Sequence, residues 1–223
     1  GMGYFRGKKL PTNMPPGDVR AYDVRTGKLR WRFNTIPQKG EYGVETWKDQ
    51  TWRWVGGCNV WSIISTDEEL GYAYLPVTAP SSNYYGGFRP GENLYGQSLV
   101  CVDVTTGKRV WHFPTIHHPV WDLDLPAAPN LVDITVDGKQ IKAVAQISKT
   151  GYTYVFDRVT GKPVWPIVER PVPTDGVLGE VLAPTQPHPT KPPAFDRQGL
   201  SDDDLIDFWP GLKKEVRKFI RQY

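Results

Sequence analysis

One nine-residue phrase occurs three times in this 223-residue chain and constrains its fold more than any other feature. The copies span 23–31, 103–111 and 157–165, and each runs from an Asp through Thr-Gly-Lys to a Trp eight residues after the Asp. A phrase repeated at long intervals is typical of architectures in which each unit buries its apolar face against its neighbours. Within each copy the Asp can cap a tight turn, and the Gly can supply a positive φ. The phrase therefore predicts a β-hairpin whose second strand carries a Trp placed to wedge against the next unit.

Runs rich in β-branched and aromatic residues predict further antiparallel strands around these hairpins. The 22 Gly and 21 Pro favour an all-β chain with many turns and long loops. The dipeptide Asp137-Gly138 is a strong signal for a two-residue hairpin turn. The expected strands cover 18–24, 28–35, 57–65, 70–77, 98–104, 108–114, 127–135, 140–148, 151–157 and 162–167.

Grouped by the repeat phrase, these strands form sets of four, which is the pattern of β-propeller blades. We expect two whole blades at about 57–114 and 127–167, and half a blade at 18–35, within a partial propeller over 1–170. About two and a half blades cannot close a ring of at least four. The chain is therefore expected to be a piece of a larger propeller, or to self-associate through its open blade edges.

The remaining residues, 171–223, are expected to form a Pro-rich, short-helical extension of the same larger domain. Residues 171–199 read as extended chain because of their many prolines. Ser201 is a candidate N-cap for a short helix over 202–208, and a second helix is expected over 211–222.

Charge and composition exclude several classes of function. A net charge of +3 is too mild to indicate a nucleic-acid partner, and no basic cluster alternates with aromatic residues. No apolar run reaches the ~18 residues of a membrane span, and no signal peptide is recognised. Cys58 and Cys101 have neither metal-ligand nor redox-pair spacing, and the sequence leaves a disulfide between them undecided.

The densest group of chemically useful side chains is the segment 117–126, His-His-Pro-Val-Trp-Asp-Leu-Asp-Leu-Pro. An Asp beside a Trp can act as a general base or bind a metal, whereas the Asp pair can also simply cap a loop while Trp121 packs in the core. Lys149, in the turn 148–151, is by itself most simply an exposed turn lysine. Trp61, at the head of an expected strand, is by default a core residue.

Together these segments resemble a known family. The segment 117–126, followed by Lys149-Thr-Gly and by 156–166, is similar to the quinoprotein dehydrogenases that depend on pyrroloquinoline quinone (PQQ). The similarity is greatest to the membrane-type glucose dehydrogenase branch and extends over about 15–210. The resemblance implies an internal fragment of an eight-bladed propeller, with PQQ lying flat in the central funnel beside a divalent cation, calcium or magnesium.

The resemblance also implies residue roles. Asp122 matches the catalytic aspartate, Lys149 matches the lysine that contacts the quinone, and Trp61 matches the tryptophan on which the cofactor ring stacks. The acidic metal ligands of the family have no counterpart in the stretch 8–13, so the metal ligands are unknown.

The implied function is oxidation of a sugar or alcohol, with hydride transfer to PQQ and with Asp122 as the general base. The resemblance further implies a quinone or cytochrome electron acceptor, a periplasmic location for the full-length form, and no turnover by this fragment alone. The loops 36–56 and 78–97 are expected to carry specificity, but they show no decisive group. The alternative is a non-catalytic β-propeller scaffold that binds protein partners.

Overall fold

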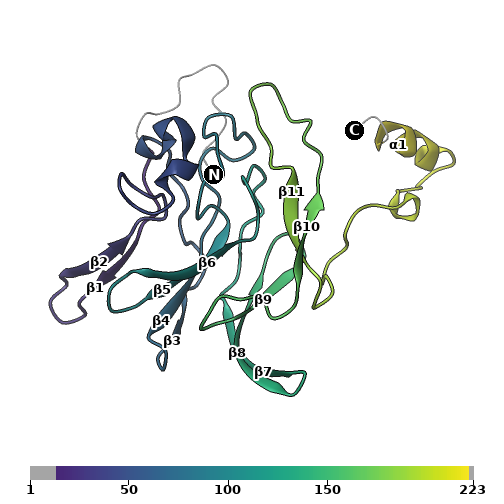
Figure 1. The fold of residues 1–223 in the computed structure, drawn as a ribbon. Helices are drawn as coiled ribbons and strands as arrows, with labels where there is room; N and C mark the ends of the chain where they lie inside the picture. The colour runs from purple at the N-terminus through teal and green to yellow at the C-terminus, as the bar shows by residue number, and fades with distance from the viewer. Residues whose placement is uncertain (1–13, 221–223) are drawn as a thin grey trace.

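The computed structural model describes residues 14–220, and these consist mainly of antiparallel strands in four small sheets (Figure 1). The strands are β1 (Val19–Tyr22), β2 (Leu29–Phe33), β3 (Ser65–Asp67), β4 (Tyr72–Pro76), β5 (Ser98–Asp103), β6 (Arg109–Pro114), β7 (Asn130–Val136), β8 (Lys139–Ile147), β9 (Thr153–Asp157), β10 (Ile167–Pro171) and β11 (Thr185–Pro189). The helices are the 3-10 turns η1 (Val44–Thr46), η2 (Lys48–Arg53) and η3 (Asp202–Asp204) and the α-helix α1 (Leu212–Ile220).

The sheets follow the order of the chain. They are β1-β2, β3-β4-β5-β6, β7-β8-β9 and β10-β11, and every pairing is antiparallel. In Figure 1 they succeed one another across the molecule, from the purple hairpin to the green one. This arrangement confirms the predicted all-β class. Within residues 14–220, no helix is long and apolar enough to cross a membrane.

The central sheet, β3-β4-β5-β6, is buried on both faces. Successive side chains of a strand point to opposite faces, so neighbouring residues of β5 belong to different core clusters. On β5, Val100 and Val102 lie in one core cluster with residues of β2 and the 36–58 segment, whereas Leu99 and Cys101 lie in another cluster with residues of β8 and β9. All four side chains are fully buried. A sheet covered on both sides by other sheets is what stacked blades require.

The three repeat phrases form the hairpin turns that the sequence predicts. In the first, the Asp23 carboxylate accepts hydrogen bonds from the backbone N–H groups of Arg25 and Thr26, at 3.1 and 2.9 Å. Gly27 follows with a φ of 67°, a conformation that glycine adopts without steric cost. The same bonds recur at Asp103 and Asp157, so the phrase encodes one turn geometry three times.

The tryptophans of the first two phrases dock on the turn of the next sheet. Trp31 donates its indole N–H to the Val104 carbonyl at 2.7 Å, and Trp111 donates to the Arg158 carbonyl at 3.2 Å. A Cβ atom on Gly107 would lie 2.6 Å from the Trp31 ring, and one on Gly161 would lie 2.5 Å from the Trp111 ring. Glycine is therefore required at both turns because the indole lies directly against the backbone.

A buried ion pair ties the second and third sheets together. Arg158 donates from Nε to the Asp67 carboxylate at 2.7 Å and from Nη1 to the Asp133 carboxylate at 2.8 Å. The Asp67 side chain is only 6% exposed, whereas that of Asp133 is 64% exposed. Burial alone would raise the pKa of Asp67, but hydrogen bonds from the Leu70 N–H and from Arg158 outweigh it and hold the pKa below 3.8.

Two predicted strands are wrong. Residues 57–64 are not a strand, because Gly57 and Cys58 have φ values of 75° and 51° and the segment makes only isolated bridges to Pro16 and Pro80. The edge strand of the second blade is the shorter β3, so that sheet begins at residue 65 rather than 57.

Residues 162–167 likewise do not complete a four-stranded third sheet. Pro163 and Pro166 have no backbone N–H to donate. The segment meets β9 through an isolated bridge at Pro163 and two backbone bonds, from Val164 to the Val155 carbonyl at 2.9 Å and from Asp157 to the Lys162 carbonyl at 2.8 Å. The chain then continues into β10, which pairs with β11. The region 171–199 therefore contains a strand that its prolines conceal in the sequence.

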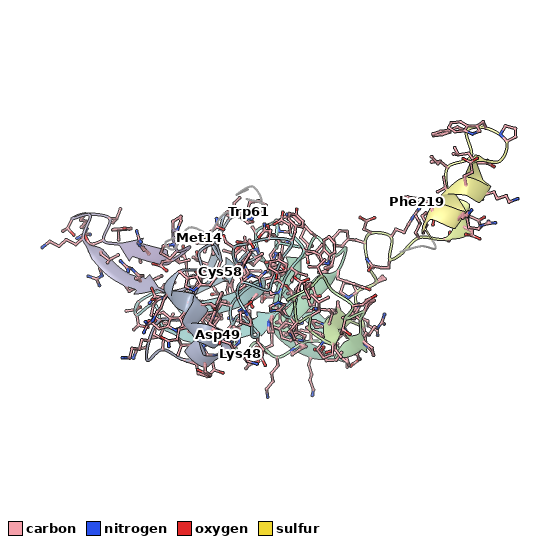
Figure 2. The ribbon with its side chains drawn as sticks, turned by 90° about the horizontal axis from the view of Figure 1, so that it is seen from above. Met14, Lys48, Asp49, Cys58, Trp61 and Phe219 are labelled. Carbon is pink, nitrogen blue, oxygen red and sulfur yellow. The ribbon has the colours of Figure 1, made fainter. Side chains whose placement is uncertain are left out.

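The first helix of the C-terminal extension is shorter than predicted. Helix η3 covers only 202–204, where the Ser201 N–H and hydroxyl both donate to the Asp204 carboxylate at 2.7 Å. The predicted second helix corresponds to α1, and its last predicted residues, 221–222, lie outside the described part of the chain. Figures 1 and 2 show α1 on an arm that projects from the body.

The two cysteines do not pair. Cys58 and Cys101 are free, fully buried, and belong to the two different core clusters on either side of the central sheet. Burial raises the pKa of both thiols, so they act as small apolar core residues.

Docking of Trp111 on Gly161 is tested by substituting alanine. Gly161→Ala introduces both a strained positive φ and a clash with the indole, so we expect the free energy of unfolding to fall by about 2 kcal/mol more than in Gly27→Ala. Gly27 is the matched control, because it occupies the same turn with a φ of 67° and has no atom within 4 Å of the added Cβ. Urea unfolding measures both. Equal losses would contradict the docking account.

The Asp67–Arg158 pair is tested by its pH dependence. At pH 7 we expect Asp67→Asn to cost about 2 kcal/mol of unfolding free energy, and the exposed control Asp133→Asn less than about 1 kcal/mol. Because the folded pKa of Asp67 is depressed, its contribution is present above pH 3.8 and is lost as the pH falls through the folded value. We therefore expect the difference in unfolding free energy between wild type and Asp67→Asn to become smaller as the pH falls from 7 to 3, as measured by urea unfolding. A gap that stays constant would refute this assignment.

Candidate functional site

The structure brings together the three site residues that the sequence predicts. Lys149 Nζ lies 3.1 Å from Asp122 Oδ2 and 5.8 Å from the centroid of the Trp61 ring. Trp61 lies in the irregular segment before β3, Asp122 in the connection from β6 to β7, and Lys149 in the turn from β8 to β9. Figure 2 shows Trp61 at the edge of the body, and its side chain is 52% exposed. It is therefore not the core residue that its sequence position suggests.

Backbone contacts explain why Lys149 faces this cluster. Gly151, with a φ of 79°, closes the turn by donating its N–H to the Ser148 carbonyl at 3.0 Å. The Lys149 N–H donates to the Asp124 carbonyl at 3.1 Å, which fastens the turn to the 117–126 segment. The segment that carries Trp61 is fastened to the 78–97 loop instead, since the Cys58 N–H donates to the Ala79 carbonyl at 3.0 Å.

Asp124 is a fourth member of the site that sequence reasoning did not single out. Its Oδ2 lies 3.3 Å from Lys149 Nζ and accepts the Trp61 indole N–H at 3.3 Å. Its Oδ1 accepts the Ala79 backbone N–H at 3.1 Å, so the expected loop-capping role is also present. The alternation Trp-Asp-Leu-Asp in the sequence was the available signal, because it places two carboxylates on one short segment.

Asn83 is a fifth contact of the site. Its side-chain amide donates to Asp122 Oδ1 at 3.0 Å, so both oxygens of that carboxylate have a partner. The loop around Asn83 is fastened to the 117–126 segment, because Tyr84 donates its N–H to the Val120 carbonyl and Arg89 donates to the Pro119 carbonyl. No local pattern in the sequence pointed to Asn83.

The electrostatics of the cluster favour a charged lysine. Burial by itself would lower the pKa of Lys149, but the hydrogen bonds and negative charges of Asp122 and Asp124 outweigh it and raise the pKa above its ordinary value. The ammonium therefore stays protonated at neutral pH.

The two histidines of the 117–126 segment do not join the site. His117 Nε2 pairs with the Glu169 carboxylate at 3.0 Å, and the buried His118 bonds through Nδ1 to the Gly91 carbonyl at 2.6 Å. Trp121 is 65% exposed and makes an edge-to-face contact with Tyr84, so it is not the core residue of the simpler interpretation. Among residues 14–220 no group of three or more His, Cys, Asp or Glu side chains could hold a metal ion.

A cavity of about 410 Å³ adjoins the segment that carries Trp61. It lies against the first hairpin, and its lining does not include Trp61, Asp122 or Lys149. The three residues thus meet outside this cavity, each with a partly exposed side chain. The lining residues are Pro16, Gly17, Asp18, Val19, Arg20, Asn59, Val60 and Ile64.

Comparison with known proteins identifies similar sequences. Residues 2–223 match the family described as "PQQ: Glucose/ethanol/alcohol dehydrogenase, beta-propeller domain". The chain is 37% identical over 201 residues to the quinate/shikimate dehydrogenase (quinone) of Acinetobacter baylyi, with 88% of this chain and 24% of that protein covered. It is 36% identical over 184 residues to the quinoprotein glucose dehydrogenase of Escherichia coli, with 79% and 22% covered. The chain thus spans about a quarter of the length of these relatives.

Comparison with solved structures identifies the same family. The quinohemoprotein alcohol dehydrogenase ADHIIG of Pseudomonas putida HK5 matches with a TM-score of 0.62 and 31% identity, over 78% of this chain and 28% of that one. The quinohemoprotein alcohol dehydrogenase of Comamonas testosteroni matches with a TM-score of 0.63 and 27% identity, over 79% of this chain and 28% of that one. The chain therefore belongs to the PQQ-dependent dehydrogenase family, and its successive antiparallel sheets are part of that family's β-propeller.

Proposed function

We propose that this chain supplies part of the cofactor and substrate site of a PQQ-dependent dehydrogenase that oxidises a sugar or an alcohol. The observation that carries the proposal is the contact of Lys149 with both Asp122 and the ring of Trp61, three residues from distant parts of the sequence. A scaffold that binds only protein partners would have no reason to hold a lysine and a carboxylate beside an exposed indole.

The residues present fit PQQ, a planar quinone with acidic groups. The half-exposed indole of Trp61 offers a flat apolar surface on which a conjugated ring can stack. The ammonium of Lys149, next to that indole, offers hydrogen-bond donors for the carbonyl or carboxylate oxygens of such a ligand. When bound, PQQ supplies the acceptor for the two electrons that leave the substrate.

A divalent cation beside PQQ belongs to the same proposal. The described residues give it no set of three protein ligands, and the stretch 8–13 lies outside them. We therefore assign no metal ligand and derive no step from the cation.

Asp122 is the proposed general base. Oxidation of an alcohol removes a proton from its hydroxyl and a hydride from its carbon. The Asp122 side chain is 36% exposed, so its carboxylate can reach a bound hydroxyl and accept that proton. Lys149 would hold its positive charge beside the electron acceptor, which would favour the transfer.

Electrons would then pass to a quinone or cytochrome acceptor, and the full-length enzyme would act in the periplasm. The specific sugar or alcohol would be selected by loops such as 36–56 and 78–97, the second of which carries Asn83. Because the relatives are much longer than this chain, activity is expected of the full-length protein.

The role of Asp122 is tested in the full-length enzyme loaded with PQQ and calcium. Asp122→Asn keeps the size of the side chain but removes its basicity, so we expect kcat for dye-linked glucose or alcohol oxidation to fall about 100-fold or more. The control is Asp137→Asn, the same change in the exposed β7–β8 turn, which should leave kcat unchanged. An Asp122→Asn enzyme with the kcat of wild type would refute the assignment.

The role of Trp61 is tested by PQQ binding rather than by turnover. Removing the ring in Trp61→Ala should weaken PQQ affinity of the full-length apoprotein about 10- to 100-fold, the size of a lost stacking contact. Trp209→Ala is the control, because Trp209 is similarly exposed, at 57%, but lies on the C-terminal extension. Fluorescence titration with PQQ measures both. Unaltered affinity in Trp61→Ala would place the cofactor elsewhere.

A further inference from the structure

Asp124 connects three separate segments at the proposed site. Through Oδ2 it meets the Lys149 ammonium and the Trp61 indole N–H, each at 3.3 Å. Through Oδ1 it accepts the Ala79 N–H at 3.1 Å. A single carboxylate thus joins the Trp61 segment, the loop that begins near Ala79, and the β8–β9 turn.

Burial separates the tasks of the two neighbouring aspartates. The Asp124 side chain is 7% exposed and that of Asp122 is 36% exposed, although both accept from the same ammonium. A buried carboxylate must keep its cation, because leaving the charge unpaired is costly. An exposed one can exchange its partner for a substrate hydroxyl or for water. Asp124 is therefore the permanent partner of Lys149, and Asp122 is the carboxylate that a substrate can reach.

The charges support the same division. One lysine between two carboxylates leaves a net negative cluster, so Lys149 retains a strong anionic partner even while Asp122 takes up a proton. The Trp61 ring, exposed on its open side, has Asp124 as its hydrogen-bond partner at the indole nitrogen. Loss of that bond would free the ring to rotate.

On this basis we infer that Asp124 is a positioning residue for the cofactor, holding the Lys149 ammonium and the Trp61 ring in the geometry in which both contact PQQ. The inference rests on the proposed function and deepens it. Asp124 acts through Lys149 and Trp61, whereas Asp122 acts on the substrate.

The Asp124→Asn substitution distinguishes positioning of Lys149 and Trp61 from simple loop capping. The amide oxygen of Asp124→Asn can still accept the Ala79 N–H, so the cap is kept. The amide NH2 then faces the lysine ammonium and the indole N–H, which are both donors, so those two contacts are lost. A residue with only a capping role would tolerate this change.

The experiment uses the full-length apoprotein and measures PQQ affinity by fluorescence titration and thermal stability without PQQ. We expect Asp124→Asn to weaken PQQ binding about 10- to 100-fold with a folded apoprotein, and Asp122→Asn to weaken it less than about threefold. In a Lys149→Met background, Asp124→Asn should have a much smaller effect than in wild type, because the two residues act as a unit.

Equal PQQ affinity in Asp124→Asn and wild type would overturn the inference while leaving the proposed function intact. The same fold loss in the wild-type and Lys149→Met backgrounds would also overturn it, since Asp124 would then not act through Lys149. If wild type does not bind PQQ, both proposals fail.

If Asp124→Asn does not fold, the Trp61→Phe variant tests the inference instead. It keeps an aromatic ring but lacks the indole N–H that donates to Asp124. A measurable loss of PQQ affinity, about threefold or more, supports the inference, and unchanged affinity contradicts it.

Discussion

Contact between a tryptophan ring and the glycine of a hairpin turn determines how neighbouring sheets pack on one another. Trp31 lies on Gly107, and Trp111 lies on Gly161, and each indole N–H reaches the carbonyl that follows the Asp of the next repeat. The Asp-capped turn makes that carbonyl available, so one short phrase encodes both the hairpin and its docking surface. Because the same contact recurs, the first three sheets are placed on one another in the same way, as a propeller requires.

The proposed site depends on this stacking, because its members come from neighbouring sheets. Trp61 precedes the first strand of the central sheet, Asp122 and Asp124 lie in the connection between that sheet and the next, and Lys149 lies in a turn of the next sheet. A shift of one sheet on the other would separate Lys149 from both carboxylates. The buried Asp67–Arg158 pair and the shared core cluster resist such a shift. Stability between the sheets and geometry at the site are therefore parts of one arrangement.

Features with a local cause could be predicted from the sequence. The three hairpins follow from Asp, Thr and Gly within a few residues, and the convergence of Trp61, Asp122 and Lys149 followed from a family resemblance. Features that depend on tertiary packing could not. Residues 57–64 look like a strand until the positive φ of Cys58 is known, and Asp124 looks like a loop cap until its burial and its contact with Lys149 are seen. The prolines of β11 likewise conceal a strand that its partner β10 stabilises.

The central claim is that Trp61, Asp122 and Lys149 form one cofactor site, and a crystal structure of the full-length protein with PQQ tests it most directly. We expect electron density for a planar ring lying on the Trp61 indole, with a quinone oxygen within hydrogen-bonding distance of Lys149 Nζ and the Asp122 carboxylate facing the substrate side. Density for PQQ remote from these three side chains would contradict it.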